Sequence, residues 1–123
     1  MKKSIILFLG IVVFSVAQEK GISPYSSTFD ACLKDNPHPD GCMEDELTYQ
    51  DKVLNKTYKK AKESIQPFRQ ESLKDIQRVW IKYRDMKCDF FYHKESGSGG
   101  ITDVLMCKLD MTIERTEELK EIF

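Results

Sequence analysis

The sequence predicts an all-α fold, a small disulfide-linked bundle of three main helices preceded by a short one. Apolar residues recur at spacings of three, four or seven along most of the chain, which is the period of amphipathic helices. No stretch alternates apolar and polar residues as a half-buried strand would. Four cysteines are present in a short chain, as in small exported domains that supplement a modest core with disulfides.

Residues 1–17 have the form of a secretory signal peptide. A lysine-containing start leads into an almost wholly apolar run at 4–16, and the small residues Ser15 and Ala17 precede the expected cleavage point. That run is too short to span a bilayer. No cysteine follows directly, so we expect no lipid anchor and no stable membrane anchor. We expect residues 18–123 to form a single helical domain that is periplasmic or secreted.

The first two helices are expected on either side of a proline-rich turn. Ser26 and Ser27 are suited to cap a short helix, and the segment KDNPHPDG at 34–41 then interrupts it. Asp40 is a suitable start for the second helix, because acidic residues are favoured in the first turn. The first helix carries Phe29, Cys32 and Leu33, and the apolar positions of the second are Leu47, Leu54, Tyr58, Ala61 and Ile65.

The last two helices are expected on either side of a glycine- and serine-rich loop. Pro67 suits the first turn of the third helix, the segment ESGSGG at 95–100 forms the loop, and Thr102 caps the last helix. The expected inward stripe of the third helix is Leu73, Ile76, Trp80, Tyr83 and Lys87. The corresponding residues of the last helix are Leu105, Leu109, Ile113 and Leu119.

The cysteines of the exported part are Cys32, Cys42, Cys88 and Cys107. An even number in an exported chain indicates two disulfides, and four cysteines allow three pairings. We predict Cys32–Cys42 and Cys88–Cys107, because neighbouring helix ends meet most easily. The spacings do not suit a zinc site, and we predict no metal.

Charge and residue pattern argue against nucleic-acid binding and catalysis. Residues 52–94 carry 12 basic and 5 acidic residues, but both flanking segments are net acidic. The basic residues are spread around helical faces, as on a solvated surface. Neither His38 nor His93 has a partner at a spacing that forms a catalytic pattern. We therefore predict no enzyme, no cofactor and no nucleic-acid partner.

The stretch WIKYRDMKC at 80–88 is interpreted as core. Trp80 and Arg84 are four residues apart, so they share a helical face and the guanidinium can lie over the indole. A half-buried arginine needs a carboxylate, and we expect Asp51 first and Asp110 second. Trp80 is expected to be largely buried beside Leu54 and Tyr58, with Asn55 as a polar partner in the core.

The same residues carry a family resemblance. LNKTY at 54–58 with Asp51 upstream, QRVWIKYRDMKC at 77–88, Cys107 and TIER at 112–115 resemble the LprI-type lysozyme-inhibitor family over about residues 29–119. The motif residues are Asp51, Leu54, Asn55, Tyr58, Gln77, Trp80, Tyr83, Arg84, Asp85, Thr112 and Arg115. The resemblance implies an exported bacterial helical domain with disulfides and, for some members, binding and inhibition of lysozyme.

Two function hypotheses follow. In the first, the chain binds a protein partner, lysozyme, and occludes its cleft with a loop of small residues and hydrogen-bond donors; the candidate residues are His93, Lys94, Ser96 and Ser98. In the second, the chain is an envelope structural or interaction protein with an unrelated partner. The sequence leaves the oligomeric state open.

Overall fold

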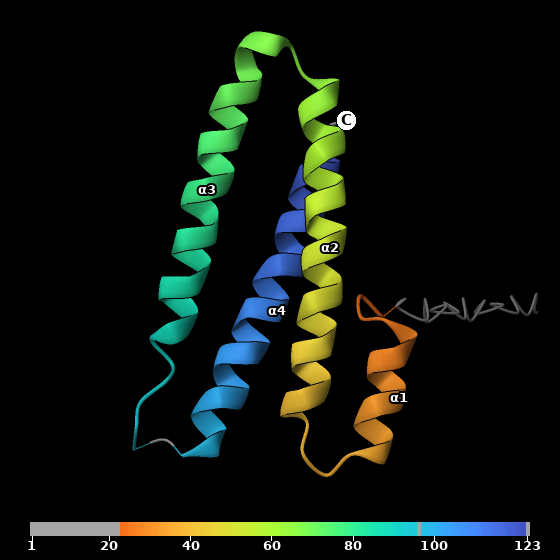
Figure 1. Cartoon of the computed structure of the whole chain (residues 1–123), viewed down its shortest axis with the longest axis vertical. Helices are drawn as coiled ribbons and strands as arrows, with labels where there is room; N and C mark the ends of the chain where they lie inside the picture. The colour runs from red at the N-terminus through yellow and green to blue at the C-terminus, as the bar shows by residue number, and fades with distance from the viewer. Residues whose placement is uncertain (1–22, 96, 123) are drawn as a thin grey trace, which may run out of the picture.

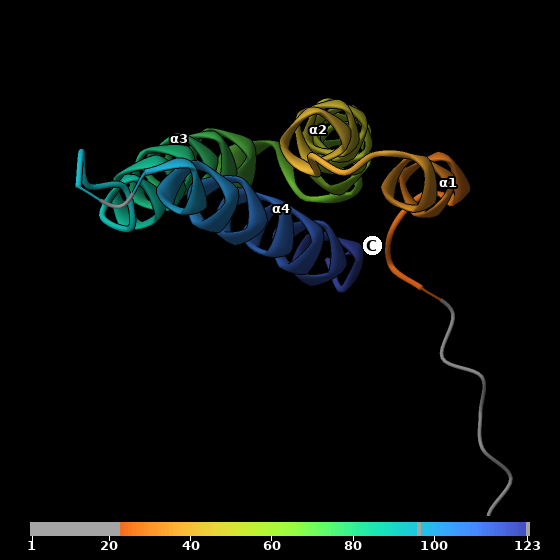
Figure 2. The same ribbon diagram turned by 90° about the horizontal axis from the view of Figure 1, so that it is seen from below.

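The structure is a computed structural model that describes residues 23–95 and 97–122. The described part contains four helices and no strand: α1 (Ser27–Asp35), α2 (Asp40–Ser64), α3 (Pro67–Asp89) and α4 (Ser98–Lys120). The three long helices lie side by side and α1 flanks the start of α2 (Figures 1 and 2). The predicted all-α fold is confirmed. The expected signal peptide at 1–17 lies outside the described residues.

The first three helices begin at the residues that the sequence predicted. Ser26 is the N-cap of α1, and its Oγ accepts the backbone N–H of Phe29 at 3.2 Å. Asp40 begins α2, and Pro67 occupies the first turn of α3, where its missing N–H costs nothing. None of the described helices is long and apolar enough to cross a membrane.

The interior lies mainly between α2 and α4, which are the two helices in closest contact. One cluster, at the α1 end, contains Phe29, Cys42, Met43 and Leu109. A second, toward the α2–α3 turn, contains Leu54, Ala61, Leu73 and Leu119, with Tyr58 and Trp80 partly buried against it. Thr112 and Thr116 fill the space between the clusters and are almost fully buried. Small side chains at these positions allow α2 and α4 to approach closely.

The expected stripe of α3 is wrong in three positions. Ile76 and Tyr83 are 54% and 56% exposed, and Lys87 is exposed as well. The buried residues of α3 are Leu73, Gln77, Arg84 and Cys88. Polar residues take the inward face because α2 and α4 supply hydrogen-bond partners for them. The apolar residues one position away then face water.

Two expectations about α4 and the loop before it are also corrected. Helix α4 begins at Ser98, so the glycines at 99 and 100 are helical and the loop is shorter than expected. Thr102 lies inside the helix and does not cap it. Its Oγ1 donates to Oδ1 of Asp40 at 2.6 Å and thereby joins the first turns of α4 and α2. The residue before α4, Gly97, has φ +63°, a conformation that glycine adopts without strain.

Both predicted disulfides are present. Cys32–Cys42 joins α1 to α2 with a Cα–Cα distance of 5.8 Å, and Cys88–Cys107 joins α3 to α4 with a distance of 5.5 Å. Each lies at the α1 end of the bundle, close to a connection between consecutive helices. The disulfides therefore fix the geometry of that end.

Candidate functional site

Arg84 joins three helices through polar contacts. Its Nη1 donates to Oδ1 of Asp51 and to Oγ1 of Thr112, both at 2.9 Å, and its Nε donates to Oδ1 of Asp85 at 3.1 Å. The Arg84 side chain is 10% exposed and that of Asp51 is 43% exposed. The predicted Arg84–Asp51 pair is confirmed. Asp110, the second choice, instead accepts the hydroxyl of Tyr25 at 3.1 Å.

The hydroxyl of Thr112 both accepts and donates a hydrogen bond in this network. Thr112 Oγ1 accepts from Arg84 and donates to the backbone carbonyl of Lys108 at 2.7 Å. Thr116 repeats the second contact one turn later, donating to the carbonyl of Thr112 at 2.9 Å. Buried polar groups cost little when their hydrogen bonds are complete, so this threonine pair is compatible with the interior.

Two arginines lie over Trp80. The Cζ of Arg84 is 5.4 Å and the Cζ of Arg115 is 5.9 Å from the ring centroid. Arg115 also donates from Nε to Oε1 of Gln77 at 3.0 Å. The predicted stacking of Arg84 on Trp80 is confirmed, but Trp80 is only partly buried. Trp80 packs against the second cluster as expected, although it is not among the fully buried residues.

Other motif residues differ in their exposure. Leu54 is buried and Tyr58 partly buried, as expected. Asn55 is exposed, so its expected role as a polar partner in the core is wrong. The buried polar residue of that turn is Thr57, which lies on the inward face of α2, whereas Asn55 is two residues away and faces water. Within the described residues, Nε2 of Gln77 is buried without a hydrogen-bond partner.

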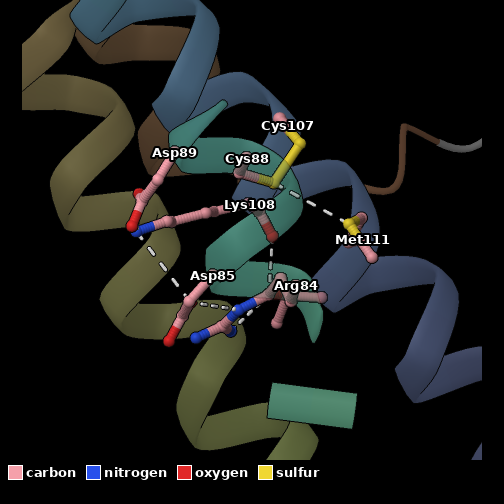
Figure 3. Close-up of a disulfide and its surroundings, with 8 residues drawn as sticks. Arg84, Asp85, Cys88, Asp89, Cys107, Lys108 and Met111 are labelled. Atoms are coloured by element: carbon pink, nitrogen blue, oxygen red, sulfur yellow. Dashed lines mark hydrogen bonds and ion pairs between the residues drawn. A yellow bond between two sulfur atoms is a disulfide. The ribbon is translucent and has the colours of Figure 1, made fainter. Parts of the chain in front are cut away.

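A second ionic cluster surrounds the Cys88–Cys107 disulfide. Lys108 Nζ lies 3.0 Å from Asp89 Oδ1 and 3.9 Å from Asp85 Oδ1. Figure 3 shows this lysine reaching from α4 toward both carboxylates of α3, beside the disulfide. The Sδ of Met111 is 3.7 Å from Cys88 Sγ, a packing contact since a cystine sulfur carries no proton. The cluster fixes the end of α3 against the middle of α4.

The polar contacts that join the segment just before α1 to α2 were not predicted from the sequence. The buried carboxylate of Glu46 accepts from the backbone N–H of Ser26 at 2.9 Å, from the Ser26 hydroxyl, and from Gln50 Nε2 at 2.8 Å. The pKa of Tyr25 is raised, first by burial and then by its hydrogen bond to Asp110. The only sequence signal was the spacing of four between Glu46 and Gln50, which many solvated helices share.

The candidate loop residues are placed as follows. His93 and Lys94 are exposed in the connection between α3 and α4. Ser96 lies outside the described residues, and Ser98 is the first residue of α4. The backbone N–H of Glu95 donates to Nδ1 of His93 at 3.2 Å, so a neutral His93 ring carries its proton on Nε2 and is a donor there.

The surroundings of this connection are apolar. Phe91 and Tyr92 are exposed. Tyr92 borders a shallow hollow of about 340 Å³ whose other walls are Asp89, Ile101, Val104 and Leu105. We name residues 91–95 the α3–α4 end. Aromatic residues are enriched at protein-binding surfaces relative to the rest of the surface.

The family model described as lysozyme inhibitor LprI matches residues 32–119. The chain belongs to this family. The LprI match spans both disulfides and the Arg84 network, so it confirms the resemblance carried by the motif residues. An uncharacterized protein of Rhizobium meliloti (strain 1021) is 31% identical, over 66% of this chain and 68% of the relative. No solved structure matches the chain.

The geometry separates the LprI motif from the candidate loop. Asp51, Gln77, Arg84 and Thr112 contact one another or their neighbours across the helices. His93 and Lys94 make no contact with another helix among the described hydrogen bonds and ion pairs. The side chains of His93 and Lys94 are therefore exposed to solvent, whereas the Arg84 network joins the helices.

Proposed function

We propose that the mature chain is an exported bacterial protein that inhibits a lysozyme by placing the α3–α4 end in the enzyme's sugar-binding cleft. Membership of the LprI family supports the class of target. The proposal rests on one observation. Phe91, Tyr92, His93 and Lys94 are exposed on a connection that begins shortly after Cys88, which the Cys88–Cys107 disulfide joins to α4.

The side chains of the α3–α4 end suit such a cleft. Glycoside hydrolases of this kind hold two carboxyl groups beside the scissile bond. The Lys94 ammonium and the His93 Nε2–H are donors for those carboxylates. Phe91 and Tyr92 supply rigid aromatic contact area, for which little side-chain entropy is lost on binding.

Electrostatics would assist the encounter with a basic lysozyme surface. The first turns of α2 and α4 lie at the same end of the molecule as residues 91–95 (Figure 1). They carry exposed carboxylates at Glu44, Asp45 and Asp103. Complementary charge around a contact raises the association rate and selects against wrong partners, so these residues would orient the inhibitor rather than fill the cleft.

Preorganisation supports the same assignment. The Cys88–Cys107 disulfide and the Lys108–Asp89 ion pair hold both sides of the connection. A loop that is already fixed loses less conformational entropy when it binds. A short connection of this kind can therefore support tight binding.

The test is an inhibition assay with several lysozymes acting on a peptidoglycan suspension. The variant His93→Ala with Lys94→Ala should weaken inhibition by at least about tenfold, equivalent to about 1.4 kcal/mol. Its matched control is Lys56→Ala with Lys59→Ala, which removes two exposed cationic side chains from α2 and should leave inhibition unchanged. Absence of inhibition of every lysozyme by the wild-type chain would contradict the proposal.

Export is part of this proposal. Cleavage after Ala17 would release a chain that begins at Gln18, in the periplasm or outside the cell. N-terminal sequencing of the protein recovered from those fractions measures this directly. A product that retains Met1 and sediments with membranes would be incompatible with it.

A second candidate function is an envelope interaction protein with an unrelated partner. The exposed apolar residues along α3, away from the α3–α4 end, favour it. In that case the wild-type chain would bind an envelope protein in a pull-down and inhibit no lysozyme. The double variant at His93 and Lys94 would then retain its binding.

A further inference from the structure

Helix α3 carries a continuous apolar stripe on its solvent side. The stripe consists of Ile76, Val79, Tyr83, Met86 and Phe90, and we name it the α3 stripe. The exposed fractions of Val79, Met86 and Phe90 are 66%, 75% and 85%. Single exposed apolar residues are ordinary, but a continuous exposed row marks an interaction surface.

The spacing of the α3 stripe is that of a coiled-coil seam. Successive members are separated by three, four, three and four residues, so they occupy the a and d positions of two heptads. The stripe is distinct from the inward face of α3, where Leu73, Gln77, Arg84 and Cys88 are buried. A seam of this period packs best against another helix with the same period, because each residue inserts between four residues of the facing helix.

We propose that the α3 stripe pairs with the α3 stripe of a second copy of this chain, with the two helices antiparallel. Among the described helices no other carries a matching exposed row, whereas a second copy supplies an identical one. In the proposed register Tyr83 packs against Met86 of the other copy, and Val79 packs against Phe90. This inference does not rest on the proposed function.

Charge complementarity selects the antiparallel arrangement. Lys82 and Asp89 flank the stripe on the same side, at g positions, and in antiparallel coiled coils g positions of the two helices meet. The proposed register brings Lys82 of each copy opposite Asp89 of the other, which gives two opposite-charge pairs. A parallel pair would bring Lys82 opposite Lys87 twice. Asp89 keeps 63% of its side chain exposed beside Lys108 and is therefore accessible to a second lysine.

The remaining flanking positions of the seam, the e positions, are Trp80 and Lys87. In the same register Trp80 of each copy lies opposite Lys87 of the other, because e positions of antiparallel helices meet. The flanking positions therefore contribute two opposite-charge pairs and no directly opposed like-charge pair. The seam is short, so the dimer is expected to be reversible and to form at higher protein concentration.

Sedimentation equilibrium of the mature chain tests the proposal. The weight-average mass should rise toward twice the monomer mass as concentration increases. The variant Val79→Lys with Met86→Lys should weaken the dimer by at least about tenfold, because four added cations would meet in the seam. The control, Tyr49→Lys with Ile122→Lys, changes two other exposed apolar residues and should dimerise like the wild type.

A charge swap tests the register. Lys82→Glu alone should weaken the dimer, and adding Asp89→Lys should restore it. Circular dichroism of each variant verifies that the monomer remains folded. A chain that stays monomeric at every concentration would overturn the proposal, as would a Val79→Lys, Met86→Lys variant that dimerises normally. A monomer whose stripe binds a different protein would overturn the assignment to a second copy.

Discussion

The middle of α3 and the α3–α4 end use similar residue types in different ways. In the middle, Arg84 and Trp80 contact each other and side chains of α2 and α4. At the end, His93 and Lys94 are exposed beside Phe91 and Tyr92. A cation and an aromatic ring in the LprI motif therefore hold the helices together. The same pair at the end of the helix is free to contact a partner.

Figure 3 shows how closely the two regions are connected. The carboxylates of Asp85 and Asp89 are one turn apart on α3, and Lys108 lies between them. Asp85 also accepts from Arg84, so a continuous chain of ion pairs leads from the buried network to the disulfide.

The largest loss of stability is expected for a change in the middle of α3, and it tests whether this region holds the helices together. Arg84→Ala should lower the free energy of unfolding by about 3 kcal/mol, the lower part of the range for breaking a buried pair, because Asp51 remains partly in water. Urea unfolding followed by circular dichroism measures it. Lys82→Ala, an exposed change two residues away, is the control and should stay within about 0.5 kcal/mol. A stable Arg84→Ala protein that no longer binds its partner would reverse our assignment of the two regions.

The next effect concerns the disulfide between the regions. Replacing Cys88 and Cys107 by alanine opens a loop with a sequence separation of 19 and should cost about 3 kcal/mol in the chain-entropy description. It should also weaken inhibition beyond what the lost stability explains, since the α3–α4 end becomes free. Replacing Cys32 and Cys42, with a separation of 10, should cost slightly less and leave inhibition intact. Unfolding and inhibition are measured on both variants, and equal inhibition by the two would argue against a preorganised end.

A smaller loss is expected for Trp80→Ala. Full burial would predict about 3–5 kcal/mol, but Trp80 is only partly buried, and we expect about 2 kcal/mol. Chemical unfolding again provides the measurement, with the exposed neighbour Val79→Ala as control. A loss equal to that of Val79→Ala would show that the indole contributes nothing to the core.

The smallest effect on stability is expected at the α3–α4 end. His93→Ala and Lys94→Ala, singly or together, should change the free energy of unfolding by less than about 0.5 kcal/mol, because both side chains are solvent-exposed. Thermal unfolding in parallel with the inhibition assay separates the two properties. A marked loss of stability would mean that these residues belong to the fold, and the contrast between the regions would disappear.

The sequence predicted those features that depend on local chemistry. Ser26 as a cap, Pro67 in a first turn and a disulfide across each short connection follow from residues close together in the chain. The Arg84–Asp51 pair was also predicted, because an antiparallel turn near Pro67 relates the two helices by a simple register. The family resemblance rested on the same residues and was confirmed.

The sequence failed where tertiary partners decide the outcome. Ile76 and Tyr83 fit an apolar stripe better than Gln77 and Arg84, yet the polar pair lies inside. Asp51 and Thr112 accept hydrogen bonds from Arg84, and Arg115 donates one to the Gln77 carbonyl oxygen. Periodicity cannot reveal such partners. Glycines at 99 and 100 suggested a loop, but α4 begins before them, and Thr102 in its second turn is joined to Asp40 of α2. In the candidate site, the exposure of His93 and Lys94 agreed with expectation, whereas Ser98 was placed in a loop and belongs to a helix.

The preferential packing of α2 on α4 makes folding depend on contacts between distant parts of the chain. The two helices are separated in sequence by the whole of α3, so the chain must close a long loop before its main interface can form. Closure of this kind slows folding relative to bundles in which consecutive helices pack in turn. Early oxidation of Cys88 and Cys107 would shorten the search by holding α4 beside the end of α3. Refolding of the reduced chain should therefore be slower than refolding of the oxidised chain, even under conditions in which both reach the native state.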